Sequence, residues 1–288
     1  MKLAVSMWSY FRTWRAGDFS IPDFIRTAKV AGAEGVELLD FFYKGIGSDK
    51  PVVLTEADVA PERAAALEAL AETGLPCPIF SVGQNFAKAD PAAREIEVAK
   101  IRFGVDEALH YGAGVVRVFA GDLHGDLTFD TTRQWIIEGL TAGANYAHEH
   151  GVKLALENHG KLAGRGDQVR SIIEDVRAAC GHDTLGANPD TGNFLLVNQP
   201  SHVAIEEVAS LAYMVHFKDF NLGDGPFVAL DGTVFQGAAV GEGVVELETC
   251  IRLLKESGYD GWLSVEYEGE EDPMTAVPRS LANARRYL

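Results

Sequence analysis

The chain alternates short apolar runs typical of strands with longer runs typical of helices, and this alternation limits its possible folds more than any other feature. The predicted strands are Leu3–Met7, Gly35–Leu39, Pro78–Val82, Val115–Phe119, Lys153–Glu157, Leu185–Asn188, Met214–Phe217 and Trp262–Val265. The predicted helices are Ile21–Ala31, Pro61–Glu72, Pro91–Tyr111, Thr131–His150, Asp167–Ala179, Pro200–Leu211, Leu247–Ser257 and a last one that ends the chain. Such alternation indicates βαβ units around a parallel sheet.

Eight strands in strict alternation with eight helices favour a closed (β/α)8 barrel, the TIM barrel. Its typical size is about 250 residues, somewhat below the 288 of this chain. An open doubly wound sheet is the alternative, but the turn after the first strand lacks the GxGxxG with which a Rossmann fold binds a pyrophosphate. No linker or shift in composition divides the sequence. We therefore expect one α/β barrel domain over residues 1–288.

Charge and cysteine content limit the partners and the compartment. The formal net charge of −17 argues against nucleic acid or an anionic membrane as a partner. No run approaches the roughly 18 apolar residues of a membrane helix, and the N-terminus lacks a signal-peptide pattern. Cys77, Cys180 and Cys250 are odd in number and widely spaced, so they predict free thiols in a reducing cytoplasm.

Four residues of the second half stand where successive predicted strands end: Glu157, Asp190, His216 and Glu266. Side chains alternate along a strand, and the aliphatic neighbours of these residues fit the face toward the helices. All four candidates then point to the barrel axis, at the C-terminal face where such barrels build active sites. A lone strand-end acid is more often a cap or a salt-bridge partner. The coincidence of four on consecutive strands weakens that explanation.

Three carboxylates and one imidazole form a hard, oxygen-rich donor set. Such a set suits Mn²⁺, Mg²⁺ or Co²⁺ with coordination positions left open for water or substrate oxygens. A closed structural zinc site is expected to use thiolates instead. The sequence therefore predicts one divalent cation at the mouth of the barrel.

Several segments resemble the xylose-isomerase-like TIM barrel superfamily, particularly its sugar phosphate isomerase/epimerase branch. They are the segment around Glu157, the turn Asp190-Thr191-Gly192-Asn193, the segment His216-Phe217-Lys218-Asp219, Gly241-Glu242-Gly243, and Gly258-Tyr259-Asp260-Gly261-Trp262 leading into Glu266. The resemblance covers most of the chain and is strongest from Lys153 onward. It implies one Mn²⁺, Mg²⁺ or Co²⁺, with Mn²⁺ as first choice, held by Glu157, Asp190, His216 and Glu266.

The same resemblance implies a reaction. Members of the branch remove and return a proton beside a metal-chelated ketose carbonyl, through an enediolate, with Glu157 and Glu266 as the implied acid/base groups. Relatives often form homo-oligomers. One departure is Asn193, where many relatives carry a histidine for substrate or a second metal. The DNA-repair endonucleases of the superfamily need further histidines, which Gly83–Asn85 and Ala120–Asp122 do not offer.

Other residues are expected to touch the substrate. Trp8 and Arg117 share the inward parity, while His159 and Lys218 lie two residues beyond Glu157 and His216; Asn193 completes this predicted substrate-binding set. A rim position for His159, ordinary packing for Trp8 and a buried ion pair between Glu37 and Arg117 are the structural alternatives.

The leading functional hypothesis is a divalent-metal-dependent sugar isomerase or ketose 3-epimerase acting on a small-molecule sugar. No Gly-rich turn with clustered Lys or Arg follows the last two strands, which favours an unphosphorylated substrate. Two alternatives stay open: a metal-dependent lyase that cleaves a 3-keto-glycoside by β-elimination, and a non-catalytic sugar-binding barrel. Asn221–Gly243, with six glycines, is expected to form either a lid or a disordered excursion.

Overall fold

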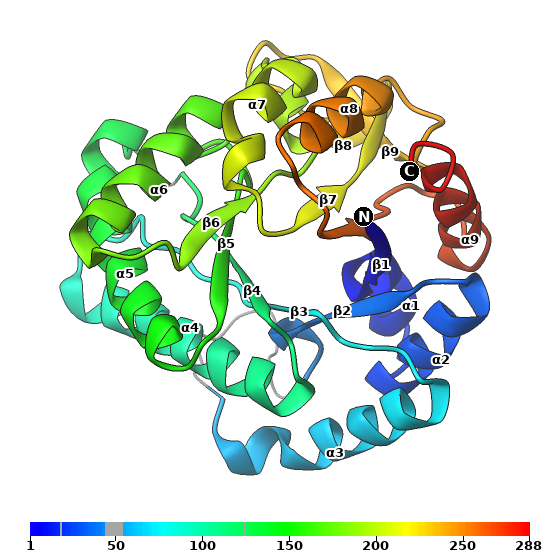
Figure 1. Cartoon of the computed structure of the whole chain (residues 1–288). Coiled ribbons are helices and arrows are strands. Elements are labelled where there is room, and N and C mark those ends of the chain that lie inside the picture. Colours follow the sequence, from blue (N-terminus) through cyan, green and yellow to red (C-terminus); the bar gives the residue numbers. More distant parts are fainter. Residues whose placement is uncertain (18, 44–53, 124) are drawn as a thin grey trace.

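The computed structural model describes residues 1–17, 19–43, 54–123 and 125–288 and shows a barrel of eight parallel strands (Figure 1). The strands are β1 (Lys2–Ser6), β2 (Gly35–Leu39), β3 (Ile79–Ser81), β4 (Val115–Val118), β5 (Lys153–Glu157), β6 (Leu185–Asn188), β7 (Val215–Phe217) and β10 (Trp262–Val265). Their order is β6-β5-β4-β3-β2-β1-β10-β7. Single parallel bridges, Ala187–Ala212 and Asp190–His216, join β6 to the β7 side and close the barrel.

Helices surround the strands as an outer layer (Figure 1). They are α1 (Phe11–Arg15), α2 (Ile21–Ala31), α3 (Glu56–Thr73), α4 (Pro91–Tyr111), α5 (Phe129–Glu149), α6 (Gly166–Cys180), α7 (Ser201–Val208), α8 (Leu247–Glu256) and α9 (Pro273–Ala284). Short 3₁₀ turns follow several strands and helices: η1 (Met7–Tyr10), η2 (Asp40–Phe42), η3 (Asn193–Val197) and η4 (Ala209–Leu211). Within the described ranges, no helix combines the length and the apolarity that crossing a bilayer requires.

The predicted elements match the observed ones closely, with differences at their ends. The largest is in α3, which was expected to begin at Pro61 but begins at Glu56. Thr55 caps this helix through a capping box with Asp58, so Pro61 lies inside the helix rather than at its first turn. The first strand ends at Ser6, because the Ser6 side chain accepts a hydrogen bond from the Trp8 backbone and starts η1.

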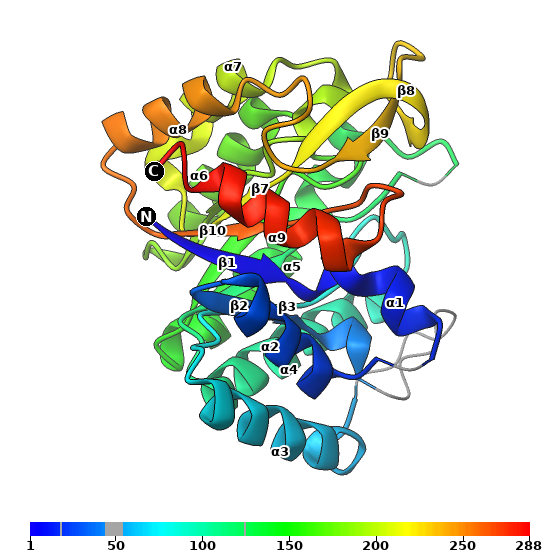
Figure 2. The ribbon, with the colours of Figure 1, turned by 90° about the vertical axis from the view of Figure 1, so that its right-hand side faces the viewer.

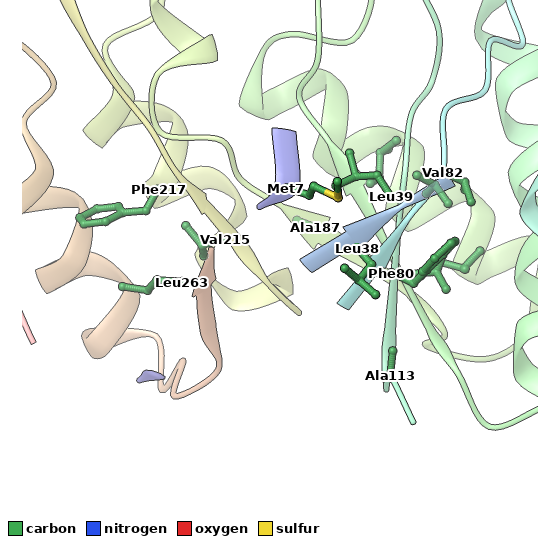
Figure 3. Close-up of a cluster of buried hydrophobic side chains, with 14 of the residues drawn as sticks. Met7, Leu38, Leu39, Phe80, Val82, Ala113, Ala187, Val215, Phe217 and Leu263 are labelled. Carbon is green, nitrogen blue, oxygen red and sulfur yellow. The ribbon is translucent and has the colours of Figure 1, made fainter. Parts of the chain in front are cut away.

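Strand parity divides the core into an outer and an inner part, as predicted. Outward side chains such as Phe80, Val215, Phe217 and Leu263 belong to the large cluster between strands and helices (Figure 3). A separate small cluster of Ile79, Ala155 and Met214 fills the interior of the barrel. A buried aliphatic or aromatic side chain stabilises the fold by about 1.5–3 kcal/mol, so this alternation fixes which side chains can face the axis.

The segment after β7 is an ordered antiparallel hairpin, β8 (Asp219–Val228) with β9 (Val234–Ala238). Of the two alternatives for Asn221–Gly243, the disordered excursion is therefore wrong, and a lid stays a prediction. The hairpin lies at the end of the barrel away from the N-terminus (Figure 2). Gly237 permits its close approach to the chain after β10, since a Cβ there would come 2.3 Å from the backbone of Glu268. The hairpin thus covers an edge of the barrel's C-terminal face.

Candidate metal centre and active site

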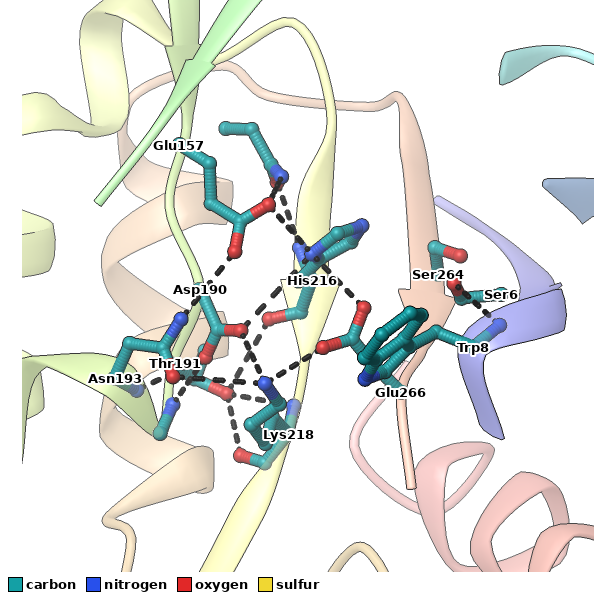
Figure 4. A network of polar contacts seen from close by, with 12 residues as sticks. Ser6, Trp8, Glu157, Asp190, Thr191, Asn193, His216, Lys218, Ser264 and Glu266 are labelled. Carbon is teal, nitrogen blue, oxygen red and sulfur yellow. Dashed lines mark hydrogen bonds and ion pairs between the residues drawn. The ribbon is translucent and has the colours of Figure 1, made fainter. Parts of the chain in front are cut away.

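The four predicted ligands lie together at the C-terminal ends of adjacent strands (Figure 4). Glu157 is the last residue of β5, His216 lies in β7, and Asp190 and Glu266 follow β6 and β10. All four side chains are buried, with at most 5% of any residue exposed. The parallel register of the strands brings these positions to one level of the barrel, as the sequence predicts.

The distances between these side chains are those of a single small site. Nδ1 of His216 lies 3.2 Å from Oε2 of Glu157, 3.4 Å from Oε2 of Glu266 and 4.0 Å from Oδ2 of Asp190. One ligand atom each from Glu157, Asp190 and His216 lie within 4.8 Å of one another. Ligands about 2.1 Å from a common ion are necessarily separated by roughly 3–4 Å, so the group has the right size for one cation.

Two fully buried polar atoms in this group, Nδ1 of His216 and Oδ2 of Asp190, have no hydrogen bond to any described residue. Their nearest charged neighbours are Oε2 of Glu157, 3.2 Å from Nδ1, and Nζ of Lys218, 3.1 Å from Oδ2. A buried polar atom without a partner costs about 1–3 kcal/mol, and native proteins rarely retain one without a ligand, water or ion to satisfy it. Since both atoms face the same point as Glu157 and Glu266, the donor set fits a divalent cation with nitrogen and oxygen ligands.

The local sequence fixes the orientation of Asp190. Its Oδ1 accepts hydrogen bonds from the backbone N–H groups of Gly192 (2.8 Å) and Asn193 (2.9 Å), which leaves Oδ2 directed inward. The Asn158 side chain clamps the backbone of Asp190, accepting from its N–H and donating to its carbonyl. Gly192 is required because a Cβ there would lie 2.9 Å from the Lys218 side chain. The Asp-Thr-Gly-Asn turn is therefore a rigid holder for one carboxylate.

Glu37 orients His216 from the side of the imidazole that faces away from Glu157 and Glu266. Nε2 of His216 lies 3.0 Å from both carboxylate oxygens of Glu37, and Ser81 and Ser264 also donate to this carboxylate. A carboxylate that accepts from Nε2–H fixes the ring orientation, so that a metal displacing the proton of Nδ1 would find this nitrogen directed at it. Glu37, which is fully buried, is therefore a positioning residue for His216.

The predicted ion pair between Glu37 and Arg117 was wrong. Nε of Arg117 lies 3.2 Å from Oε2 of Glu157, and its Nη1 donates to the Val82 carbonyl. Arg117 stands on β4, directly beside β5, so it reaches the glutamate of the neighbouring strand. Glu37 on β2 instead reaches across the barrel to His216.

Lys218 and Glu268 lie beside the four metal-ligand candidates and line the cavity above them. Nζ of Lys218 lies 2.6 Å from Glu266, 2.8 Å from Glu268 and 3.1 Å from Asp190. Glu268 also accepts a hydrogen bond of 2.5 Å from Nε1 of Trp8. The sequence prediction omitted Glu268, although its position two residues after Glu266 gives it the same parity. The single positive charge of Lys218 offsets part of the repulsion among three carboxylates.

The two glutamates differ in proton affinity. Burial opposes ionisation of Glu157, but His216 and Arg117 outweigh it and hold its pKa well below the usual range. Burial raises the pKa of Glu266 to about 7, against the opposing effects of Lys218 and His216. Burial also disfavours the charged form of His216, yet Glu37, Glu266 and Glu157 together raise its pKa well above the ordinary value. The site as a whole carries excess negative charge, which favours a cation.

A cavity of about 480 Å³ opens above these residues, within the range of about 300–1,000 Å³ typical of small-molecule sites. Its wall contains all five predicted substrate-binding residues: Trp8, Arg117, His159, Asn193 and Lys218. Asn193 donates to Oε1 of Glu157 at 3.3 Å. His159 packs on Phe119 with ring centroids 4.2 Å apart and the rings tilted by 30°, and its side chain is 41% exposed. It is thus a rim residue within reach of a ligand.

Aromatic residues that the sequence prediction did not single out complete the wall. They are Phe41, Phe119 and Phe227, which come from three different segments after strands. No local pattern marks them, because Phe41 lies in the short turn η2, Phe119 just after β4 and Phe227 in the hairpin. Their only signal is the position after a strand, where loops of a barrel surround the site.

Asp40 at the cavity wall gives a pH-dependent prediction. Burial raises its pKa to about 6, above the unfolded value of about 3.9. The folded protein therefore binds more protons than the unfolded chain between these values, and stability falls as pH rises through this window. We expect Asp40→Asn to raise the free energy of unfolding by about 1–2 kcal/mol at about pH 7.5 and to have no effect near pH 3. Urea unfolding at both pH values tests this, and equal stability at about pH 7.5 would contradict it.

Comparisons with known proteins agree with this architecture. The family model described as xylose isomerase-like TIM barrel matches residues 25–287. L-ribulose-5-phosphate 3-epimerase UlaE of Salmonella paratyphi A is 25% identical over 231 residues, covering 76% of this chain and 75% of that protein.

Two solved structures share the fold at low sequence identity. A structure of L-ribulose 3-epimerase has a TM-score of 0.75 at 18% identity and covers 100% of this chain and 94% of that one. A xylose isomerase-like TIM barrel protein from Mycobacterium smegmatis, in complex with magnesium, has a TM-score of 0.72 at 19% identity, covering 99% and 96%.

Proposed function

We propose that this chain, which belongs to the xylose isomerase-like TIM barrel family, is a divalent-metal-dependent isomerase or 3-epimerase of ketoses. The observation that carries the proposal is the convergence of Glu157, Asp190, His216 and Glu266 at the floor of a cavity, where Nδ1 of His216 and Oδ2 of Asp190 have no hydrogen bond to a described residue. The curated relative UlaE is named as a sugar 3-epimerase, which supports the same reaction class.

In this proposal Glu157, Asp190, His216 and Glu266 hold one cation, with Mn²⁺ first among Mn²⁺, Mg²⁺ and Co²⁺. Bound there, the cation would supply Lewis-acid polarisation of a substrate carbonyl. Glu157 and Glu266 approach His216 from β5 and β10, at 3.2 and 3.4 Å from Nδ1. In this proposal the reacting carbon of the sugar lies between these two carboxylates.

The proton transfer itself falls to these two carboxylates. One removes the proton beside the carbonyl, and the other returns a proton on the opposite face, which inverts the carbon. Lys218 holds Glu266 and Glu268 in place, while Trp8, Phe119 and Phe227 shield the site from water. Asn193 and His159 are left to bind substrate hydroxyls, since their side chains line the cavity beside Glu157.

A direct test titrates the metal-free protein with Mn²⁺ by calorimetry and then assays a panel of free ketoses for their C3 epimers and aldose isomers. One bound equivalent and a new sugar in the panel are expected. The lyase alternative begins with the same proton abstraction but releases a leaving group from a 3-keto-glycoside. A protein that binds Mn²⁺ and sugar yet changes none of these compounds would instead be the non-catalytic barrel.

The Glu37→Gln variant tests how His216 is oriented. Glutamine can still contact Nε2 but carries no charge to stabilise the imidazole in the metal-binding tautomer. We expect Mn²⁺ affinity to fall by about 10–100-fold, the usual effect of removing such an outer carboxylate. Calorimetric titration measures this without any assay of activity. Glu97→Gln, which alters a buried glutamate paired with Lys88 and Lys100, is the matched control. Equal Mn²⁺ affinity in both variants would remove the assigned role of Glu37.

A further inference from the structure

The cavity above the metal-ligand candidates has a second polar end, formed by residues that follow β2 and β3. Asp40 directly follows β2, Gly83 follows β3, and both line the cavity together with Lys100 of α4. In the closed order of the strands, β2 and β3 stand opposite β6 and β7, whose ends carry Asp190 and His216. A ligand that reaches from the metal-ligand candidates across the barrel mouth would therefore meet Asp40.

The carboxylate of Asp40 has room for a further hydrogen bond. Its hydrogen-bond donors among the described residues are two backbone N–H groups, those of Gly83 at 3.4 Å and of Phe41. The bond from Gly83 is longer than the about 2.7–3.2 Å of an ordinary N–H···O contact, and an ionised carboxylate offers about four acceptor positions. A Cβ at Gly83 would meet no described atom within 4 Å beyond its chain neighbours, so the space beside this bond is open.

No cation of the described part of the chain forms an ion pair with Asp40, although Arg117 and Lys100 act on its charge from a distance. Arg117 contacts Glu157 at 3.2 Å instead. Lys100 contacts Glu97 at 2.9 Å. Burial raises the pKa of Asp40 to about 6, so its charge at about neutral pH costs the folded protein stability. A carboxyl whose pKa is shifted by burial in a cleft is typical of functional sites.

Aromatic packing holds Asp40 in a fixed place. The next residue, Phe41, packs against Trp8 with ring centroids 5.4 Å apart, and both rings line the cavity. Phe11 and Trp14 contact the same Phe41 ring at 5.7 and 5.6 Å. An acceptor that neighbouring side chains hold in place selects a donor at one position of a ligand, because little has to be reordered on binding.

A hydroxyl group suits this position better than a charged group. The positive charges of Arg117 and Lys100 act on Asp40, and they would also repel an ammonium group bound beside it. An anionic group would lie against the carboxylate of Asp40, and like charges brought together are disfavoured. A hydroxyl donates a hydrogen bond without adding charge, and every sugar carries several.

We propose that Asp40 is a specificity-determining residue, which accepts a hydrogen bond from a substrate hydroxyl on a carbon remote from the carbonyl. This inference rests on the proposed function for the placement of the carbonyl between Glu157 and Glu266. The carbonyl end of a ketose then lies at the metal-ligand candidates, while its other end crosses the cavity to Asp40. A sugar that lacks this hydroxyl leaves the carboxylate without the donor and is a poorer substrate.

The test compares D-tagatose and D-fructose with their 4-, 5- and 6-deoxy analogues on the Mn²⁺-loaded protein. At one of these positions we expect loss of the hydroxyl to lower kcat/KM of the wild type by about 10–100-fold, the effect of a hydrogen bond to a charged acceptor. In Asp40→Ala the parent ketose is expected to lose the same factor, and removal of that hydroxyl to cost no more than about 2-fold further. A deoxy effect of equal size in the wild type and Asp40→Ala at every position would overturn the inference.

Asp40→Asn separates lost recognition from lost stability. It is expected to be more stable than the wild type at about pH 7.5, so a lower kcat/KM cannot come from unfolding. Its neutral amide oxygen is a weaker acceptor, and the deoxy effect should be smaller than in the wild type but present. Asp106→Ala removes an exposed carboxylate of α4 outside the cavity wall and is the matched control, expected within about 2-fold of the wild type for every compound. The same change of selectivity in Asp106→Ala would also overturn the inference.

Binding without turnover separates this inference from the proposed function. The hexitols obtained by reducing each compound have no carbonyl, so calorimetry with them reports recognition alone. A Kd that rises by about 10-fold on loss of one hydroxyl in the wild type, and not in Asp40→Ala, supports the role of Asp40 even if no compound is turned over. Equal affinity for the hexitols with and without each hydroxyl contradicts it even if epimerisation is found. A wild type that neither binds nor converts any parent compound would overturn it as well.

Discussion

The Glu266→Gln variant is expected to lose proton transfer by about 10²–10⁴-fold, the usual contribution of a general acid or base. Glutamine has the shape of glutamate and can still accept a hydrogen bond from Lys218, which lies 2.6 Å from Glu266. It cannot accept or release a proton at the reacting carbon. The measurement is the initial rate of epimerisation or solvent exchange of the best ketose under saturating Mn²⁺.

Metal binding provides the control for this variant. Asp190, His216 and Glu157 remain in Glu266→Gln, so calorimetry should still find one bound Mn²⁺, although more weakly. A variant that binds Mn²⁺ and retains more than about a tenth of the wild-type rate would show that Glu266 is a ligand only. The same comparison with Glu157→Gln tests the second carboxylate. If both variants lose the rate, each side of the substrate has a proton-transfer group.

The Asp190→Asn variant is expected to lose Mn²⁺ affinity by at least about 100-fold, more than the loss of an outer-shell partner produces. The amide oxygen can still accept from the backbone N–H groups of Gly192 and Asn193, so the turn is retained. Its NH₂ group then takes the place of Oδ2 and cannot bind a cation. The substitution thus removes one ligand without disturbing the backbone that holds it.

Thermal and chemical unfolding report the loss of Mn²⁺ affinity in Asp190→Asn without an assay of activity. A ligand present at 100 times its Kd stabilises the folded state by about 2.7 kcal/mol. Wild-type protein should show this gain on addition of Mn²⁺, and Asp190→Asn should not at the same concentration. Equal stabilisation of both proteins by Mn²⁺ would place the cation elsewhere.

The fold was predictable because each strand and helix carries its own signal. Strands β2, β5, β6 and β10 match their predicted bounds, since short apolar runs between turn residues leave little choice. The hairpin β8–β9 was not predictable in the same way. Its six-glycine segment has the composition of a loop, and its order comes from pairing between the two strands and from close contact of Gly237 with Glu268. Those contacts are distant in the sequence.

The placement of the four metal-ligand candidates was predictable for a related reason. Parity alone directs Glu157, Asp190, His216 and Glu266 inward, and parallel strands bring their ends to one level. The contacts that orient these four side chains depend on which strands lie beside or opposite each other in the barrel. Parity places Glu37 and Arg117 inside but does not say that Glu37 reaches His216 while Arg117 reaches Glu157. The aromatic walls come from loops, whose positions follow from tertiary packing.

The central claim is that this site removes a proton beside a ketose carbonyl with a bound divalent cation. Its most direct measurement is deuterium incorporation from D₂O into that carbon, followed by NMR. The protein is loaded with Mg²⁺ in place of Mn²⁺, because Mn²⁺ would broaden the NMR signals. We expect incorporation by the Mg²⁺-loaded wild type into at least one compound of a panel of ketoses and keto-glycosides, and its loss in the metal-free protein and in Glu266→Gln. Protein that binds the cation at Asp190 and His216 but exchanges no deuterium into any panel compound would contradict the claim.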